Sequence, residues 1–155
     1  MATFCLIHGS GQNATAWQLL DRELTARGHE VFAPSIPTSI RDAGAAFYAE
    51  ALANSVPART DVVLVAHSAS GLILPVAAEV MTATLMVFLA AAIPVPGKSF
   101  MDQLRPDPTD MLNPEWSQWA ARERLGVQAI ELPGGHCPHI SRPDELAAVL
   151  LSLTE

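Results

Sequence analysis

The chain has 155 residues, of which half are apolar and only 16% are charged. This length and composition predict a single soluble domain, residues 1–155, with one sizeable core. Sixteen acidic against nine basic side chains give a formal charge of −7, and the only lysine is Lys98. With no cluster of basic side chains to follow a phosphate backbone, we expect no nucleic-acid partner.

The longest apolar run, residues 85–93, is far shorter than the roughly 20 residues that a membrane-spanning helix needs. A strand-like segment begins at Thr3, which leaves no room for a signal peptide. Two cysteines, Cys5 and Cys137, are too few for a disulfide framework. We therefore expect a cytoplasmic protein that does not enter a membrane.

Segments of strand length alternate with helix-period segments along the whole chain. The expected strands are residues 3–7, 31–33, 62–66, 85–90 and 127–132. The third and fourth are nearly continuous apolar runs, which indicates burial on both faces of a sheet. This alternation predicts an α/β fold, a three-layer α/β/α sandwich with a mainly parallel sheet of about five strands.

Apolar residues at helical spacing predict helices at residues 14–27, 40–54, 72–80 and 113–126, and from 141 onward. Asn113 before Pro114 is a typical helix start. Ser141 is expected to cap the last helix in a capping-box variant, with Asp144 in the Glu/Gln position. Residues 93–112 are rich in proline and follow neither period, so they predict a long irregular loop.

The segment from Val62 to Gly71 carries the strongest functional signal. An apolar strand leads into small residues around Ser68 and then into a helix, which predicts a sharp turn with this serine at its apex. Backbone N–H groups at the start of such a helix can stabilise an oxyanion. The usual Gly-x-Ser-x-Gly pattern has Ala66 and Ser70 in place of its glycines, so an ordinary helix-capping role for Ser68 stays open.

The histidines are the candidates for a general base. His136 follows an expected strand and two glycines, so it could reach the carboxyl edge of the sheet, although a surface loop position is the alternative. His139 is a second candidate, with a structural role or a substrate contact favoured for it. We expect His67 to pack away from Ser68, and His29 to lie on the surface.

These segments together resemble the α/β-hydrolases, in particular the branch of plant-type methyl esterases and hydroxynitrile lyases with their bacterial esterase relatives. The resemblance covers residues 3–98 and 110–155. It rests on His8-Gly9 at the end of the first strand, on the Ser68 turn, on the strand beginning at Val87, and on the Gly-Gly-His136 loop.

The resemblance implies a serine hydrolase that cleaves a small carboxylic ester through an acyl-enzyme, with no metal or organic cofactor. Ser68 would be the nucleophile and His136 the general base. Asp110 would orient His136, with Asp107 and Asp102 as the alternatives. The remaining implied site residues are Ser10 and Ala69, whose N–H groups would form the oxyanion hole, and Gly9, Trp17 and His139, which would contact the substrate.

The same comparison of motifs distinguishes hydrolysis from lyase chemistry. In the lyases a threonine follows the histidine of the first strand, and a lysine follows the catalytic histidine. Here Gly9 and Cys137 occupy those positions, so the group that handles cyanide is missing. The resemblance therefore favours hydrolysis.

The chain departs from the family at residues 93–112, where relatives have a helical lid and a further strand. This predicts a minimal, lidless form of the fold. Either residues 127–132 pair directly with the strand at Val87, which would displace His136 by about 4.8 Å, or the sheet keeps a gap. Two other readings follow: a ligand-binding domain without a working triad, and a homodimer in which a partner completes the open sheet.

Overall fold

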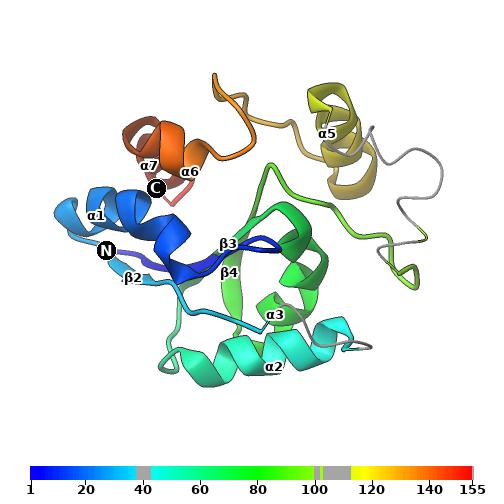
Figure 1. Ribbon diagram of the computed structural model, residues 1–155, viewed down its shortest axis with the longest axis horizontal. Helices are drawn as coiled ribbons and strands as arrows, with labels where there is room; N and C mark the ends of the chain where they lie inside the picture. Colours follow the sequence, from blue (N-terminus) through cyan, green and yellow to red (C-terminus); the bar gives the residue numbers. More distant parts are fainter. Residues whose placement is uncertain (38–42, 100–101, 103–112, 155) are drawn as a thin grey trace.

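The computed structural model describes residues 1–37, 43–99, 102 and 113–154. Its centre is a parallel sheet of four strands in the order β2-β1-β3-β4 (Figure 1). Central strand β3 is buried along its whole length, as its continuous apolar run predicts. The strands are β1 (Thr3–Ile7), β2 (Glu30–Phe32), β3 (Val62–His67) and β4 (Ala83–Leu89).

Helices cover both faces of the sheet, which confirms the α/β class (Figure 1). Within the described ranges, none of them is long and apolar enough to cross a membrane. The helical elements are 3-10 helix η1 (Ala14–Trp17), α1 (Gln18–Ala26), α2 (Ala45–Ser55), 3-10 helix η2 (Ser68–Ile73), α3 (Leu74–Val80), α5 (Pro114–Ala120), π-helix η4 (Ala121–Leu125), α6 (Pro138–Ser141) and α7 (Pro143–Ser152).

The core has two parts because successive side chains of a strand point to opposite faces of the sheet. On β1, Phe4 and Leu6 belong to the cluster that contains residues of α1 and α7. Cys5 and Ile7 belong to the cluster that contains residues of α2 and α3. Each fully buried large apolar side chain stabilises the fold by about 1.5–3 kcal/mol.

The predicted fifth strand is wrong. Residues 127–132 are described, yet they form no strand and do not pair with β4. Val127 and Ile130 are about half exposed. The segment is largely apolar and of strand length, but a strand also needs a neighbouring ladder of hydrogen bonds, and β4 is left as the edge of the described sheet.

The predicted cap at Ser141 is also wrong. The Ser141 hydroxyl donates to the carbonyl oxygen of Cys137 instead, at 3.3 Å. Residues Pro138–Ser141 form the short helix α6, and α7 begins two residues later at Pro143. Proline is well tolerated at a first helical position, so Pro143 sets the start of the last helix. The predicted start at Asn113 is confirmed, since its side chain accepts from the Glu115 N–H.

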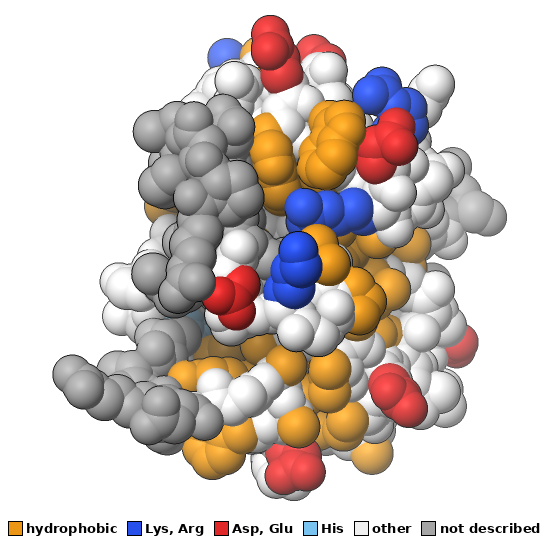
Figure 2. Space-filling model, turned by 90° about the vertical axis from the view of Figure 1, so that its right-hand side faces the viewer, with side chains coloured by type: hydrophobic (Ala, Val, Ile, Leu, Met, Phe, Trp, Pro, Cys, Tyr) orange, Lys and Arg blue, Asp and Glu red, His pale blue; other side chains and the backbone are white. Residues whose placement is uncertain are grey.

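Helix α5 and η4 are held beside the segment that follows β4. The Arg124 guanidinium lies over the rings of Trp116 and Trp119, 5.2 and 5.4 Å from their centroids. It also donates to the carbonyl oxygen of Ile93. Figure 2 faces this side of the molecule and shows Lys and Arg side chains among hydrophobic ones. This anchor fixes the end of the chain segment that leads on to His136.

Candidate active site

Ser68 lies at the apex of a sharp turn between β3 and η2, as its sequence context predicts. Its φ is +58°, a left-handed conformation that costs a non-glycine residue about 1–2 kcal/mol. Ser68 keeps this conformation because β3 ends at His67 and η2 begins at Ser68, so the chain has to turn at this one residue. The strained turn lifts the serine side chain above the carboxyl edge of the sheet, where parallel strands place their functional groups.

His136 reaches Ser68 despite the missing strand. The His136 Nε2 lies 3.1 Å from the Ser68 Oγ, which is hydrogen-bonding distance. Neither of the two expected arrangements forms among the described residues: β4 is the edge of the described sheet, and the chain from Gly126 to His136 crosses without a strand (Figure 1). The structure thus brings together a hydroxyl and an imidazole 68 residues apart.

Two glycines permit the close packing around the turn. A Cβ on Gly9 would lie 2.9 Å from the Ser68 Cβ, and one on Gly71 would lie 2.1 Å from the Ala92 carbonyl oxygen. The Ala92 N–H donates to the Ser68 carbonyl at 2.9 Å, so the segment after β4 contacts the turn directly. Gly71, one residue beyond the usual motif, therefore allows this contact. The sequence offers Ser70 at the motif position instead.

His67 and Gln12 connect the Ser68 turn with the loop of His136, a role that the sequence analysis missed. His67 Nε2 lies 2.8 Å from the His136 carbonyl oxygen, and His67 Nδ1 lies 3.0 Å from the Gln12 Oε1. The same Gln12 oxygen accepts the N–H of Gly9 at 3.1 Å. Gln12 and His67 are 55 residues apart, so no local pattern signals their contact.

His8 is buried in the loop that follows β1. Its Nε2 accepts the N–H of Ile36 at 3.1 Å, and its Nδ1 faces the Gly9 carbonyl oxygen at 3.0 Å. The Ser70 hydroxyl donates to the His8 carbonyl oxygen. These bonds fix the end of β1 next to the Ser68 turn, where the predicted oxyanion-hole residue Ser10 is exposed.

All three predicted substrate contacts are buried. Trp17 and His139 are completely buried, and their ring centroids are 4.4 Å apart. Gly9 is buried against Ser68. His29 lies outside the site, where its Nδ1 accepts the N–H of Ala2. A substrate contact by Gly9, Trp17 or His139 stays a prediction.

The acid that would orient His136 is not placed by the structure. Asp110 and Asp107 lie outside the described residues. Asp102 is described, and its carboxylate accepts the Ser99 hydroxyl at 2.7 Å. Among the described side chains, no carboxylate is hydrogen bonded to His136. The assignment of Asp110 stays a prediction.

A cavity of about 530 Å³ opens beside the Ser68 turn. Both residues predicted for the oxyanion hole, Ser10 and Ala69, line it. Ile36, Tyr48 and Ile73 make much of the remaining wall apolar. Its size and lining fit a small, largely apolar ligand with one polar group held near Ser68.

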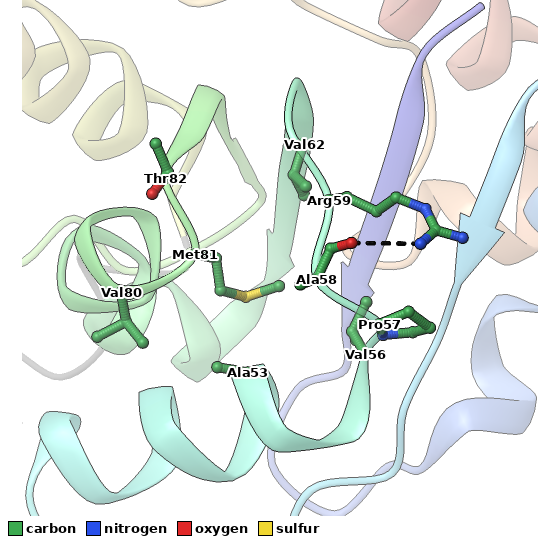
Figure 3. A pocket seen from close by; sticks show the side chains of 9 residues that line it. All are labelled: Ala53, Val56, Pro57, Ala58, Arg59, Val62, Val80, Met81 and Thr82. Atoms are coloured by element: carbon green, nitrogen blue, oxygen red, sulfur yellow. Dashed lines mark hydrogen bonds between the residues drawn. The ribbon is translucent and has the colours of Figure 1, made fainter.

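A second cavity, of about 220 Å³, lies at the opposite end of the strands. Its lining comes from the end of α2, the segment before β3 and the end of α3 (Figure 3). Val62 is the first residue of β3, whereas Ser68 follows the last one. The second cavity is therefore separate from the Ser68–His136 pair.

The sequence of residues 6–117 matches the family model described as the alpha/beta hydrolase family. This span includes the Ser68 turn and more than half of the chain. The chain belongs to the α/β-hydrolase family. No match to a curated protein was found.

Solved structures of α/β-hydrolases have the same arrangement. A mutant of polyneuridine aldehyde esterase is 19% identical with a TM-score of 0.76, covering 99% of each chain. A pyrethroid hydrolase from Sphingobium faniae JZ-2 is 16% identical with a TM-score of 0.77, covering 98% of this chain and 96% of its own. An extracellular α/β-hydrolase from a Paenibacillus species is 27% identical with a TM-score of 0.54, covering 86% of this chain and 56% of its own. Together with the family match, these similarities show the α/β-hydrolase fold.

Proposed function

We propose that this α/β-hydrolase is a serine esterase that cleaves small carboxylic esters through an acyl-enzyme. The observation that carries the proposal is the 3.1 Å separation of the His136 Nε2 and the Ser68 Oγ, at a turn where Ser68 has a positive φ. A nucleophile and a base within hydrogen-bond reach are the starting arrangement for nucleophilic catalysis.

In the proposed reaction, the Ser68 Oγ bonds to the ester carbonyl carbon while its proton passes to the His136 Nε2. The carbonyl oxygen becomes an oxyanion, which the backbone N–H groups of Ser10 and Ala69 stabilise. The tetrahedral intermediate collapses, the C–O bond to the alcohol breaks, and the alcohol leaves with the proton from His136. Water then attacks the acyl-enzyme by the reverse sequence and releases the carboxylic acid and free Ser68.

The electrostatics of the site support this role for His136 rather than its neighbours. His136 is exposed and can exchange protons with solvent and substrate. Burial lowers the pKa of His67, and burial followed by the charges of His67 and His136 lowers the pKa of His139 to about 4. Both buried histidines are therefore neutral near pH 7 and are poor proton acceptors there.

Hydrolysis of p-nitrophenyl acetate tests the general base. His136→Gln is expected to lower kcat by roughly 10²–10⁴-fold, because the Ser68 hydroxyl loses its proton acceptor. His29→Gln is the matched control, since His29 lies outside the site, and it should keep the wild-type rate. An unchanged rate in His136→Gln would contradict the assignment.

A second candidate function is a ligand-binding domain that keeps the turn without turnover. It is favoured by one observation, that no carboxylate among the described residues is bonded to His136. In that case the cavity beside Ser68 would bind an apolar acid or ester saturably. Wild-type hydrolysis no faster than the spontaneous reaction would favour this candidate over the esterase.

A further inference from the structure

Three further side chains lie near the Ser68–His136 pair and make no bond and move no proton in the proposed hydrolysis. They are His67, Cys137 and His139, and one ligand atom from each lies within 4.8 Å of the other two. The Cys137 Sγ is 4.0 Å from the His67 Nε2, and the rings of His67 and His139 are 4.5 Å apart. We call them the His-Cys-His cluster. Two imidazoles and a thiol are donors of the kind that zinc prefers.

The buried imidazole of His139 has no hydrogen-bond partner among the described residues. Its side chain is completely buried, and neither ring nitrogen has a hydrogen bond to any described residue. Leaving a buried polar group without a partner costs about 1–3 kcal/mol. In a neutral imidazole one nitrogen carries a lone pair, and in His139 this lone pair is buried and has no hydrogen-bond partner among the described residues. A bound cation would use that lone pair.

His67 faces two hydrogen-bond acceptors with only one proton to share. Its Nδ1 is opposite the Gln12 Oε1 and its Nε2 is opposite the His136 carbonyl oxygen. The Gln12 oxygen is identified by the Gly9 N–H that it also accepts. A neutral imidazole carries one N–H, so His67 satisfies either Gln12 or His136 at a given moment. With its proton on Nδ1, the Nε2 carries a lone pair, and the Cys137 Sγ lies 4.0 Å from this nitrogen.

We propose that the His-Cys-His cluster is a zinc-binding site. The His67 Nε2, the Cys137 thiolate and one nitrogen of His139 would be the ligands, and the thiol proton would be released to solvent on binding. Ligand bonds of about 2.0–2.3 Å in a tetrahedron place a sulfur and a nitrogen roughly 3.5 Å apart. The observed 4.0 Å between the Sγ and Nε2 needs a closure of only about half an ångström.

The surroundings of the cluster also suit a metal. Histidine ligands usually donate their other N–H to an oxygen atom, and the Gln12 Oε1 is in that position for His67. The Gln12 amide nitrogen lies 3.9 Å from the Cys137 Sγ and can donate to it. Cys137 is half-buried, and the neighbouring His136 is exposed, which gives an ion a path from solvent.

Zinc would also inhibit the reaction, an effect that depends on the proposed esterase function. In the metal-free protein, the Nε2–H of His67 can hold the His136 carbonyl oxygen at 2.8 Å. A zinc ion on Nε2 requires the imidazole proton to be on Nδ1, where the Gln12 Oε1 accepts it, so the His136 carbonyl loses its donor. The loop would then no longer fix the His136 ring against the Ser68 Oγ.

The first test measures binding alone. Untagged protein freed of metal is titrated with Zn²⁺ by calorimetry and with Co²⁺ by absorption spectroscopy. We expect one equivalent of each to bind, with a sulfur-to-cobalt charge-transfer band in the near ultraviolet. His139→Phe, which keeps a ring against Trp17, and Cys137→Ser should weaken Zn²⁺ binding by at least ~10-fold. The matched controls His29→Gln and Cys5→Ala should bind like the wild type.

A further test measures the reactivity of the Cys137 thiol. Burial raises the pKa of the Cys5 thiol to about 12, so we expect a disulfide reagent to modify only Cys137 in the native protein. One equivalent of Zn²⁺ should slow that reaction at least ~10-fold in the wild type and leave it unchanged in His139→Phe. Thermal unfolding confirms that each variant is folded.

The outcomes distinguish zinc binding from its proposed inhibition of ester hydrolysis. No stoichiometric binding to the wild type, or equal binding to both cluster variants, would overturn the zinc site. If p-nitrophenyl acetate hydrolysis falls with the same midpoint as Zn²⁺ binding and recovers with a chelator, the coupling is supported. Binding without inhibition would overturn the coupling. A protein that binds zinc but never hydrolyses the ester would overturn only the proposed function.

Discussion

Replacing Ser68 with alanine is expected to abolish esterase activity, with kcat for p-nitrophenyl acetate falling by at least ~10³-fold. The Ser68 Oγ is the only protein atom that forms a covalent bond to the substrate in the proposed mechanism. His136 then has no hydroxyl to deprotonate, although its ring keeps its place. Steady-state kinetics on the purified variant measure the loss, and Ser152→Ala on the exposed end of α7 is the matched control.

The positive φ of Ser68 adds a second, opposite expectation for stability. Glycine adopts φ of +58° without the strain that serine and alanine bear, so Ser68→Gly should be inactive yet more stable than Ser68→Ala by about 1 kcal/mol. Urea unfolding of the two variants measures this difference. Equal stability would mean that the turn relaxes and that Ser68 is not held in a strained conformation.

Replacing Gly71 with alanine is expected to be the most damaging change away from the reacting atoms. The new Cβ would lie 2.1 Å from the Ala92 carbonyl oxygen, which is backbone and cannot swing aside. We expect a loss of about 3 kcal/mol in the free energy of unfolding, or roughly 6–12 °C in Tm. Activity should fall as well, because the Ala92 N–H donates to the Ser68 carbonyl.

Gly135→Ala is the matched stability control for Gly71→Ala. A Cβ at Gly135 would have no neighbour within 4 Å, so the free energy of unfolding should change by less than about 0.5 kcal/mol. Thermal and urea unfolding of both variants make the comparison. A Gly71→Ala protein as stable as the control would show that the contact between η2 and the segment after β4 is not needed for the fold.

The sequence predicted the parts of the site that local chemistry determines. A continuous apolar run leading into small residues predicted β3 and the turn at Ser68, and the two glycines before His136 predicted a loop that brings its imidazole to this turn. The α/β class followed from the alternation of strand and helix periods, because each period buries one kind of face.

The features that the sequence could not predict depend on contacts between residues far apart in the chain. Residues 127–132 are largely apolar and of strand length, but whether they pair is decided by the neighbours of β4 rather than by their own composition. His67 at the end of β3 is bonded to Gln12 and to the His136 carbonyl oxygen, which lie in two different loops. Neither loop has a sequence pattern that predicts the contact. His67 was expected only to pack, because a strand residue before the turn points away from Ser68. That direction is what brings it under His136.

The most direct test of the central claim is covalent labelling of the wild-type protein with a fluorophosphonate. This reagent reacts with serines that an adjacent base activates, and the adduct is located by mass spectrometry of peptides. The account predicts one adduct per chain, on Ser68, and its loss in His136→Gln. A protein that stays unlabelled, or that is labelled on another residue, would contradict a working Ser68–His136 pair.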